Sequence, residues 1–490
     1  MTSSHNDLYR PPGLLDVLRL PLIGRLLCWR WGRLALQVPL LAAAVLLVID
    51  GFTGPQLAAR NLATVAPWVH FRGFAVLVLL LAGNLFCMAC PFTLPRTLAK
   101  RLSLGGRRFP RRLRNKWIAI ASLFLLFVTY EALDLWASPA LTAWLIVAYF
   151  VASFVLEVVF TESAFCKYIC PLGTFNFVYS TLSPTQIGVY DPDVCRACAG
   201  KECINGSYSP TPLVRLDDIP GGQREVRHGP QGTPGCGTLL FAPQIESNLD
   251  CTMCLDCVRA CPHDNVGLFV RQPGRELLHP PAWPKRWDVS LLVMMLAALG
   301  LVNAFGMVPP VYELQRALIK TFGIQSEWLL IGLIFGVGGL LLPTVLALLA
   351  GVLSRALTRK KLSLRHTVAA FTPAFVPLGF GVWFAHYGFH FLIAPLTIIP
   401  VIQEFLGQPG DWAAFSGAAD SILIGLVQVA ALVLGFLWSL ALANRTAMRL
   451  YRRDAVPGLL PWALLLLALA FAAGYVFSLP MEMRGSLLMG

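Results

Sequence analysis

Apolar runs long enough to cross a membrane as helices alternate with polar segments along the whole chain. A membrane-spanning helix needs about 20 mostly apolar residues. The pattern therefore predicts about nine spans, at Leu34–Ile49, Gly73–Cys90, Trp117–Leu135, Leu141–Phe160, Val289–Val308, Trp328–Leu353, Pro373–Ile399, Ile422–Ala443 and Leu459–Leu479. The first run is short and contains Gln37 and Pro39, which makes it the weakest of the set.

The composition agrees with a polytopic α-helical membrane protein. Of the 490 residues, 56% are hydrophobic and 13% are charged, whereas about a quarter of the residues of a soluble protein are charged. The net charge of +13 could suggest nucleic acid binding. Lys and Arg also collect in the cytoplasmic loops of membrane proteins, so we expect no nucleic acid partner. No cleavable signal peptide is evident, because no small-residue cleavage site follows the first apolar run.

The distribution of Lys and Arg predicts which loops lie in the cytoplasm. The segment Arg96–Lys116 contains nine Lys and Arg residues and no acidic residue, and Arg355–Arg365 and Arg445–Arg453 are also basic. In contrast, Glu404–Asp420 contains neither Lys nor Arg. The pattern predicts a multi-pass protein of the bacterial inner membrane, with a cytoplasmic N-terminus and an external C-terminus.

This topology divides the chain into three expected domains. Residues 1–164 form a membrane domain with four spans, and residues 288–490 form a second one with five spans. Between them, residues 165–287 would lie in the cytoplasm. The cysteine spacing described next predicts that this inserted domain is an α+β, ferredoxin-like domain.

The most specific motif of the chain lies in the inserted segment. The run Cys251–Pro262 reads CTMCLDCVRACP, which is the C-x₂-C-x₂-C-x₃-C-P spacing of bacterial ferredoxins. In that spacing, three cysteines bind one [4Fe–4S] cluster and the fourth binds a second cluster. Zinc is the alternative, because paired C-x₂-C units also bind zinc, but four cysteines at this spacing with a trailing proline favour iron and sulfur.

Four further cysteines bring the inserted segment to eight, enough for two [4Fe–4S] clusters. The ferredoxin pattern of sharing suggests two groups. Quartet A consists of Cys195, Cys198, Cys203 and Cys261. Quartet B consists of Cys236, Cys251, Cys254 and Cys257. Residues 205–235 are rich in Gly, Pro and charge and are expected to form an inserted loop.

Two cysteine pairs end in proline near the cytoplasmic ends of predicted spans. Their cysteines, which we call quartet C, are Cys87, Cys90, Cys166 and Cys170. Because both pairs reach the same face of the membrane, they could converge on one cofactor-binding redox or metal site. The alternative is that these cysteines only pack as small apolar residues. Cys28 stands alone and is expected to be structural.

With two Cys-Pro pairs followed by a ferredoxin-like segment, residues 73–270 resemble the membrane-bound polyferredoxin family, whose members include NapH, NosR, CcoG and FtrD. The resemblance implies electron transfer between the membrane or cytoplasm and a periplasmic acceptor. Quartet A is irregular for the family, and the short members lack the five later spans. The periplasmic flavin domain of NosR is absent from this chain. These departures weaken a role in nitrate or nitrous-oxide reduction, and the length fits a polyferredoxin of periplasmic iron uptake.

Ionisable residues inside predicted spans are candidates for function, because they are costly there. His386 and His390 lie four residues apart on one helix face, toward the outer side. They could hold haem b or a further metal ion, or they could form hydrogen bonds between helices. His70 could add a ligand. Glu157 could act catalytically by taking a proton from a quinol, or it could pair with the basic segment before the third span.

These features predict an electron-transfer protein, and they leave open whether it is an oxidoreductase in its own right. Electrons from a cytoplasmic or quinol donor would pass through two [4Fe–4S] clusters toward a periplasmic metal ion or metalloprotein, in iron or copper uptake. One alternative is a component of an iron or copper transporter with a redox gate. Another is the quinol dehydrogenase subunit of a periplasmic reductase. Transport predicts repeated polar residues in the later spans, which offer few beyond His386, His390 and Gln428.

Overall fold

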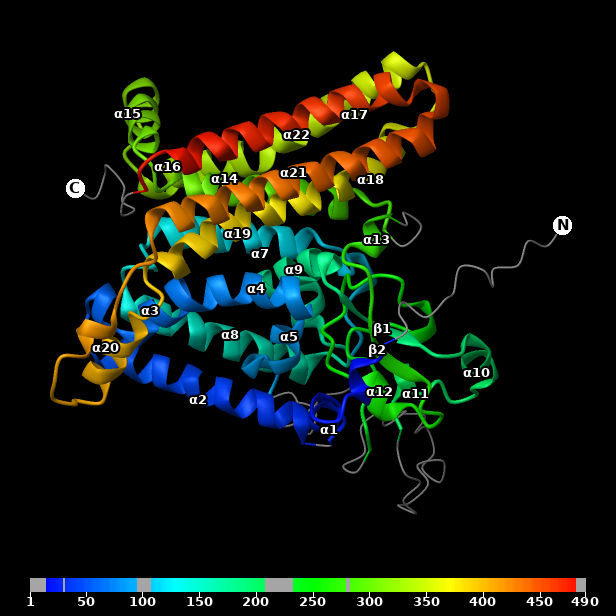
Figure 1. The fold of residues 1–490 in the computed structure, drawn as a ribbon, viewed down its shortest axis with the longest axis horizontal. Helices are drawn as coiled ribbons and strands as arrows, with labels where there is room; N and C mark the ends of the chain where they lie inside the picture. Colours follow the sequence, from blue (N-terminus) through cyan, green and yellow to red (C-terminus); the bar gives the residue numbers. More distant parts are fainter. Residues whose placement is uncertain (1–14, 30, 95–106, 208–231, 279–282, 482–490) are drawn as a thin grey trace.

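The structure is a computed structural model that describes residues 15–29, 31–94, 107–207, 232–278 and 283–481. Long helices run roughly along one direction, and a smaller part that contains two strands lies at one end of them (Figure 1). Most of the basic segment before the third predicted span lies outside the described residues, and so does most of the expected loop 205–235.

Seven helical stretches among the described residues are long and apolar enough to cross a membrane. They are Gly32–Thr53, Leu62–Ala82, Pro139–Val159, Trp287–Phe305, Glu327–Thr358, Leu364–Ile393 and Ser421–Ser478. The last stretch contains two helices, α21 (Ser421–Tyr451) and α22 (Ala455–Ser478), which pack against each other. The helix α7 (Trp117–Ala132) is apolar but shorter. A polytopic helical membrane protein is confirmed, and the count of nine spans stays a prediction.

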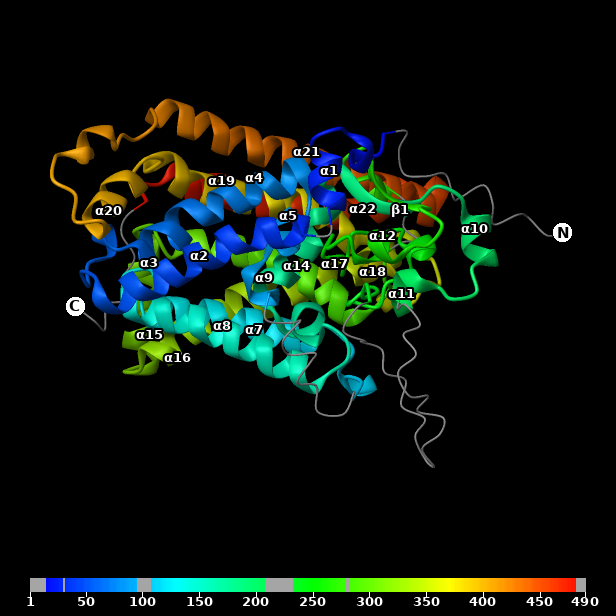
Figure 2. The same cartoon turned by 90° about the horizontal axis from the view of Figure 1, so that it is seen from below.

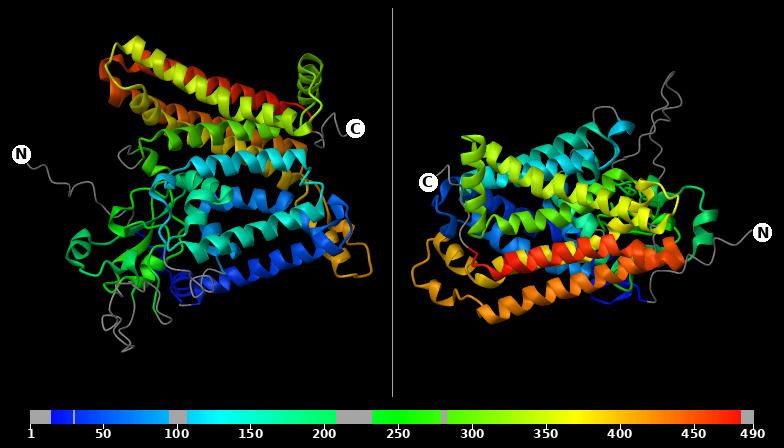
Figure 3. Two further views of the ribbon diagram at one scale, coloured as in Figure 1. Left: turned by 180° about the vertical axis from the view of Figure 1, so that it is seen from behind. Right: turned by 90° about the horizontal axis from the view of Figure 1, so that it is seen from above.

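The helices of the membrane part are arranged in layers that Figure 1 shows from the front and Figure 3 from behind and from above. Their bounds are α2 (Gly32–Thr53), α3 (Leu62–Val65), α4 (Arg72–Ala82), α8 (Pro139–Val159), α14 (Trp287–Phe305), α16 (Glu327–Phe335), α17 (Leu342–Thr358), α18 (Leu364–Phe371) and α19 (Phe375–Ile393). Helix α2 packs along α8, and α19 packs on α4, α14 and α21. Helix α19 therefore joins the N-terminal helices to the C-terminal ones.

Burial separates central helices from peripheral ones. In the most apolar 18 residues of Leu364–Ile393, 89% are buried, whereas only 22% are buried in the corresponding window of Gly32–Thr53. The side chains of Trp383 and Phe375 on α19 are fully enclosed in the core. The exposed apolar side chains of the peripheral helices would face lipid, because lipid is as apolar as they are.

The second span differs from its predicted limits, Gly73–Cys90. The helical stretch starts at Leu62, passes through a π-helical turn at Ala66–Phe71 and ends at Ala82. It stops because Gly83 has a φ of +82°, a conformation that glycine adopts easily. A Cβ atom at Gly83 would lie 2.7 Å from the Thr185 hydroxyl, so the strand region touches the membrane part here. Cys87 consequently lies on a separate short helix, α5 (Leu85–Ala89).

The strand region lies between α8 and α14 in the sequence. Its strands, β1 (Thr185–Val189) and β2 (Val266–Val270), are antiparallel, with Ile187 opposite Leu268. Its helices are α10 (Pro192–Ala197), α11 (Glu202–Asn205), α12 (Asp256–Ala260) and α13 (Arg275–Leu278). Helix α9 (Pro171–Tyr179) precedes β1 and packs in the core of the membrane helices (Figure 1). All cysteines of quartets A and B lie between β1 and β2 in the sequence. Near the N-terminus, Leu15 accepts a hydrogen bond from the Val270 N–H, and α1 (Ile23–Cys28) follows it.

The opposite end of the helices carries two short amphipathic helices. They are α15 (Pro310–Phe322) and α20 (Ile398–Phe405), and both lie far from the strands when the molecule is seen from the front or from below (Figures 1 and 2). Helix α22 also ends at this side, whereas α1 lies beside the strands (Figure 1). Helix α1 and the C-terminal end of α22 therefore lie at opposite ends of the helical body.

Candidate functional site

Quartet A lines a small cavity beside the sheet. Asn265, which directly precedes β2, donates its side-chain N–H to the Cys195 sulfur at 3.2 Å and its backbone N–H to the Cys261 sulfur at 3.5 Å. Burial raises the pKa of Cys203 to about 11, and the charges of Cys195, Cys261 and Cys198 add to this rise. The four cysteines of quartet A therefore line one cavity, and their binding of a cluster stays a prediction.

Quartet B gathers in the same way, but deeper in the protein. Burial raises the pKa of Cys257, and the charges of Cys236, Cys254 and Cys251 raise it further. Cys251, Cys254 and Cys257 are all buried. The loop that holds them has two non-glycine residues at positive φ, Met253 at +51° and Leu255 at +62°. Such backbone conformations cost energy and persist where the surroundings impose them, often at binding sites.

Quartets A and B are in contact through the backbone. The N–H of Cys236 donates a hydrogen bond of 2.9 Å to the carbonyl oxygen of Cys203. The core beside β1 and β2 contains cysteines of both quartets, together with Met88 of helix α5. Quartets A and B therefore share one core with helix α5.

Quartet C forms where two chain segments meet at the end of the membrane helices. Cys87 lies on α5, and Cys90 is the residue that directly follows this helix. Cys166 lies on a π-helical turn at Phe165–Ile169. Burial raises the pKa of Cys166, and the charges of Cys170, Glu157, Cys90 and Cys87 raise it further. The four thiols predicted to converge are therefore neighbours, with the Glu157 carboxyl beside them.

The proline that follows Cys170 explains how this cysteine is placed at the start of a helix. Pro171 is the first residue of α9, a position at which proline loses no helical hydrogen bond. Cys170 is consequently the N-cap residue, and its sulfur accepts the backbone N–H of Gly173 at 3.2 Å. Asn176, one turn later, donates to the Cys87 sulfur at 3.5 Å. Helix α9 thus presents N–H donors to both Cys-Pro pairs.

Several polar residues that the sequence analysis did not single out connect quartets B and C. Asn84 donates its side-chain N–H to the Cys251 carbonyl oxygen at 2.9 Å. Arg33 of α2 donates to the Asp256 carboxylate at 3.2 Å and to the Met88 carbonyl oxygen at 3.3 Å. No short-range sequence pattern marks Arg33 or Asn84, because their partners are far away in the sequence.

A buried ion pair supports the loop before Cys251. Arg271 and Glu276 are fully enclosed and lie 3.4 Å apart. Glu276 accepts the backbone N–H of Asn248 at 2.7 Å, and the Asn248 side chain donates to the Ser180 carbonyl oxygen. A buried charge is tolerated more easily beside an opposite charge, which Arg271 supplies to Glu276. The sequence analysis missed this pair, although two opposite charges beside a predicted cluster motif could have drawn attention to it.

The basic segment before α7 has partners other than Glu157. Arg114 lies 3.4 Å from the Glu162 carboxylate, and the Lys116 ammonium contacts the Asp250 carboxylate. Glu157 is buried, and its charge acts on Cys166. Both readings of Glu157 stay predictions, because residues 95–106 of the basic segment lie outside the described residues.

The histidines of α19 lie where their spacing predicted. The Nε2 atoms of His386 and His390 are 3.1 Å apart, and His386 is fully buried. Two nitrogen ligands of one tetrahedral metal ion, each about 2.0–2.1 Å from it, stand roughly 3.3 Å apart, so the pair suits a metal ion. Residues on the same helix face cannot both be axial ligands of one haem, so haem b could bind through only one of them. His70 contacts Phe391 at a ring distance of 6.1 Å and contacts the Val65 carbonyl oxygen.

The cysteines offer the donors that iron–sulfur clusters require. All thirteen cysteines are described and free of disulfides, and Cys28, outside the quartets, is exposed. Among the described residues, no group of three or more His, Cys, Asp or Glu side chains is arranged to hold a single metal ion. In a [4Fe–4S] cluster each cysteine binds a different iron atom, so its ligands stand farther apart than those of one ion. Four free thiols with N–H donors to their sulfurs fit such a cluster.

Comparisons with known proteins give no further support for a family. No protein-family model, curated protein or solved structure matches this chain. The resemblance to membrane-bound polyferredoxins therefore rests on the cysteine motifs of the sequence and stays a prediction.

Proposed function

We propose that this protein carries electrons across a membrane, as a polyferredoxin-like protein. Quartets A and B would each hold one [4Fe–4S] cluster, and quartet C would be the next redox site. The observation that supports this most is that all cysteines except Cys28 fall into three groups that are linked in turn. The Cys236 N–H donates to the Cys203 carbonyl oxygen, and Asn84, beside α5, donates to the Cys251 carbonyl oxygen. When bound, such clusters take up and release single electrons.

The surroundings of quartets B and C suit groups that gain negative charge. Arg33 places a guanidinium group near Cys254 and near quartet C. Lys167, between two ligands of quartet C, donates its ammonium N–H to the Thr238 carbonyl oxygen beside quartet B. Positive charge and N–H donors near a cluster favour its reduced state, so these residues would help electrons enter the membrane part.

The proposed orientation places the strand region in the cytoplasm, as a ferredoxin-like domain of an inner-membrane protein with nine spans. Basic residues at the strand end of the helices support this, since Lys116 contacts Asp250 and Arg365 donates to the Lys285 carbonyl oxygen. Counting α21 and α22 separately and adding α7 would give nine passages. The opposite positions of α1 and of the C-terminal end of α22 agree with an odd number.

Reporter fusions test this orientation. A fusion that ends after Leu268 is expected to be active only with a reporter that works in the cytoplasm. The matched fusion after Gly407, beyond α20, should be active only with an exported phosphatase. Phosphatase activity at Leu268 would reverse the topology and the direction of electron flow.

The outward route needs a carrier in the outer half of the membrane. The hydrocarbon layer is about 30 Å thick, which is far for a single electron transfer from the inner face. His386 and His390, with their facing nitrogen atoms, are proposed to hold an iron or copper ion there, or haem b through one of them. The acceptor would be a periplasmic metalloprotein or a metal-uptake partner.

Electron transfer across vesicles tests both the function and this route. The protein is placed in sealed vesicles with an electron acceptor inside, and a reductant is added on the strand side. Replacing His386 and His390 with Leu should leave the cysteine sites reducible, but reduction of the enclosed acceptor should fall to the rate of vesicles without protein. Gln428→Leu is the control, because Gln428 is also buried and donates to the Ala385 carbonyl oxygen at 3.4 Å. An unchanged rate of acceptor reduction in the histidine variant would mean that His386 and His390 have only a structural role.

Two other functions remain candidates, each with one observation in its favour. The buried Glu157 beside Cys166 would suit a quinol dehydrogenase subunit, because a quinol must lose protons when it is oxidised. The facing histidines would also suit a step in iron or copper transport. In the vesicle assay, transport would appear as metal accumulation inside without an enclosed electron acceptor.

A further inference from the structure

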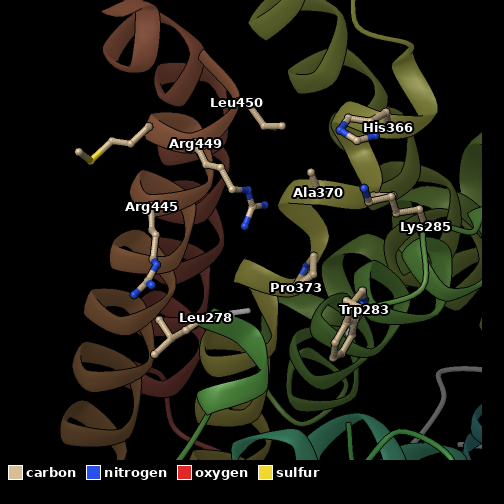
Figure 4. A pocket seen from close by; sticks show the side chains of 11 residues that line it. Leu278, Trp283, Lys285, His366, Ala370, Pro373, Arg445, Arg449 and Leu450 are labelled. Atoms are coloured by element: carbon tan, nitrogen blue, oxygen red, sulfur yellow. The ribbon is translucent and has the colours of Figure 1, made fainter. Parts of the chain in front are cut away.

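A second cavity lies where the membrane helices meet the strand region. It has a volume of about 680 Å³, and α13, α18, α21 and residues 283–285 line it (Figure 4). Three of its lining residues are cations, Lys285, Arg445 and Arg449, and a fourth is His366. The remaining walls are apolar, and no acidic residue lines the cavity.

Some basic residues at this end of the molecule have acidic partners, and the three cations of the cavity have none among the described residues. Arg114, Lys116, Arg286 and Lys360 each lie within ion-pair distance of an Asp or Glu carboxylate. Within the described parts of the chain, Lys285, Arg445 and Arg449 form no ion pair. Three cations that share an apolar cavity repel one another, so a bound anion would relieve an unfavourable arrangement.

The apolar surface beside the cavity indicates what kind of anion would bind. Leu434, Leu437, Arg445 and Met448 lie on one face of α21, because they are spaced by three and eleven residues. Leu434, Leu437 and Met448 are 67%, 54% and 57% exposed, so this face forms an apolar stripe that leads to Arg445. A molecule with a negative head and long apolar chains would match both parts of this surface.

We propose that this cavity binds the phosphate headgroup of an anionic phospholipid, with Arg445, Arg449 and Lys285 around the phosphate and the acyl chains along the α21 stripe. Basic pockets between membrane helices commonly bind anionic headgroups. Free phosphate has the same charge but no chains, and the apolar stripe favours the lipid.

The position of the cavity gives the lipid a consequence for the proposed function, although its binding does not depend on that function. Leu278 of α13 lines the cavity, and α13 follows Gly274, where an added Cβ atom would lie 2.3 Å from the Trp438 ring of α21. The strand region and α21 are thus in direct contact beside the cavity. A bound lipid would touch both and would hold the cysteine quartets against the membrane helices.

Lipid retention by the purified full-length protein tests the proposal. The protein is taken up in detergent from vesicles of equal phosphatidylglycerol and phosphatidylethanolamine, washed, and analysed by native mass spectrometry. We expect retention of phosphatidylglycerol over phosphatidylethanolamine by roughly tenfold or more, and loss of this preference in Arg445→Gln/Arg449→Gln. The control, Lys361→Gln/Arg453→Gln, removes the same charge at the same end but outside the cavity and should behave like the wild type.

Three results would overturn the proposal. One is equal retention of both lipids by the wild-type protein, and another is an equal loss in the control variant. The third is protection from thermal unfolding by inorganic phosphate that equals protection by phosphatidylglycerol, because the ligand would then be the free ion. If the double variant does not fold, Lys285→Gln, which lies outside the membrane helices, gives the same test. None of these readouts depends on iron or electron transfer, so a failure here is distinct from a failure of the proposed function.

Discussion

Replacing Cys254 with serine is expected to halve the iron that the protein holds in quartets A and B. Anaerobically purified wild-type protein should contain about eight iron atoms per chain from these two sites, four in each. Cys254 belongs to quartet B, and serine is a much poorer ligand for these clusters. Iron analysis of Cys254→Ser should therefore give about four atoms at these sites, with the cluster of quartet A retained.

The neighbouring quartet provides the matched experiment. Cys203→Ser should remove the cluster of quartet A and keep that of quartet B, because the Cys203 carbonyl oxygen, and not its sulfur, joins the two sites. Cys28→Ser is the control, since Cys28 is exposed and belongs to no quartet. Stoichiometric zinc with no iron in the wild-type protein would contradict the proposal, as would full iron in both quartet variants.

Replacing Cys90 with serine is expected to stop electron transfer from quartet B to the outer side of the membrane. Quartet C lies at the end of the membrane helices, close to the loop that holds quartet B. Asn84 donates to the Cys251 carbonyl oxygen of that loop, and Arg33 donates to the Asp256 carboxylate. If quartet C holds a redox group, loss of one ligand should disable it while both clusters keep their iron. The rate of acceptor reduction in sealed vesicles measures this directly.

The double variant and an alanine variant separate a redox site from packing. Cys90→Ser/Cys170→Ser should cost no more than Cys90→Ser alone, because residues that act as one unit are not additive. Alanine at Cys90 is small and apolar, so it would be tolerated if the thiol only packed. A redox site predicts that Cys90→Ala fails as completely as Cys90→Ser. Normal acceptor reduction in Cys90→Ala would mean that quartet C has only a structural role.

The sequence alone determined the features that depend on neighbouring residues. Apolar runs predicted the membrane helices because a span needs only a continuous apolar stretch, whatever its neighbours are. The spacing of Cys251, Cys254 and Cys257 predicted that they gather, since so few residues separate them. The helical period placed His386 and His390 on one face, and their nitrogen atoms do face each other.

Only the tertiary structure decided the features that depend on distant residues. Hydropathy could not separate the enclosed α19 from the peripheral α2, because both are apolar and differ only in what surrounds them. The close approach of Thr185 to Gly83, where the second span ends, joins residues that are about a hundred positions apart. Two other features also join segments that are far apart in the sequence. One is the proximity of Cys87 to Cys166, and the other is the cavity that Lys285 lines together with Arg445 and Arg449. Such contacts arise when segments that are far apart in the sequence pack together, so a local pattern of residues cannot predict them.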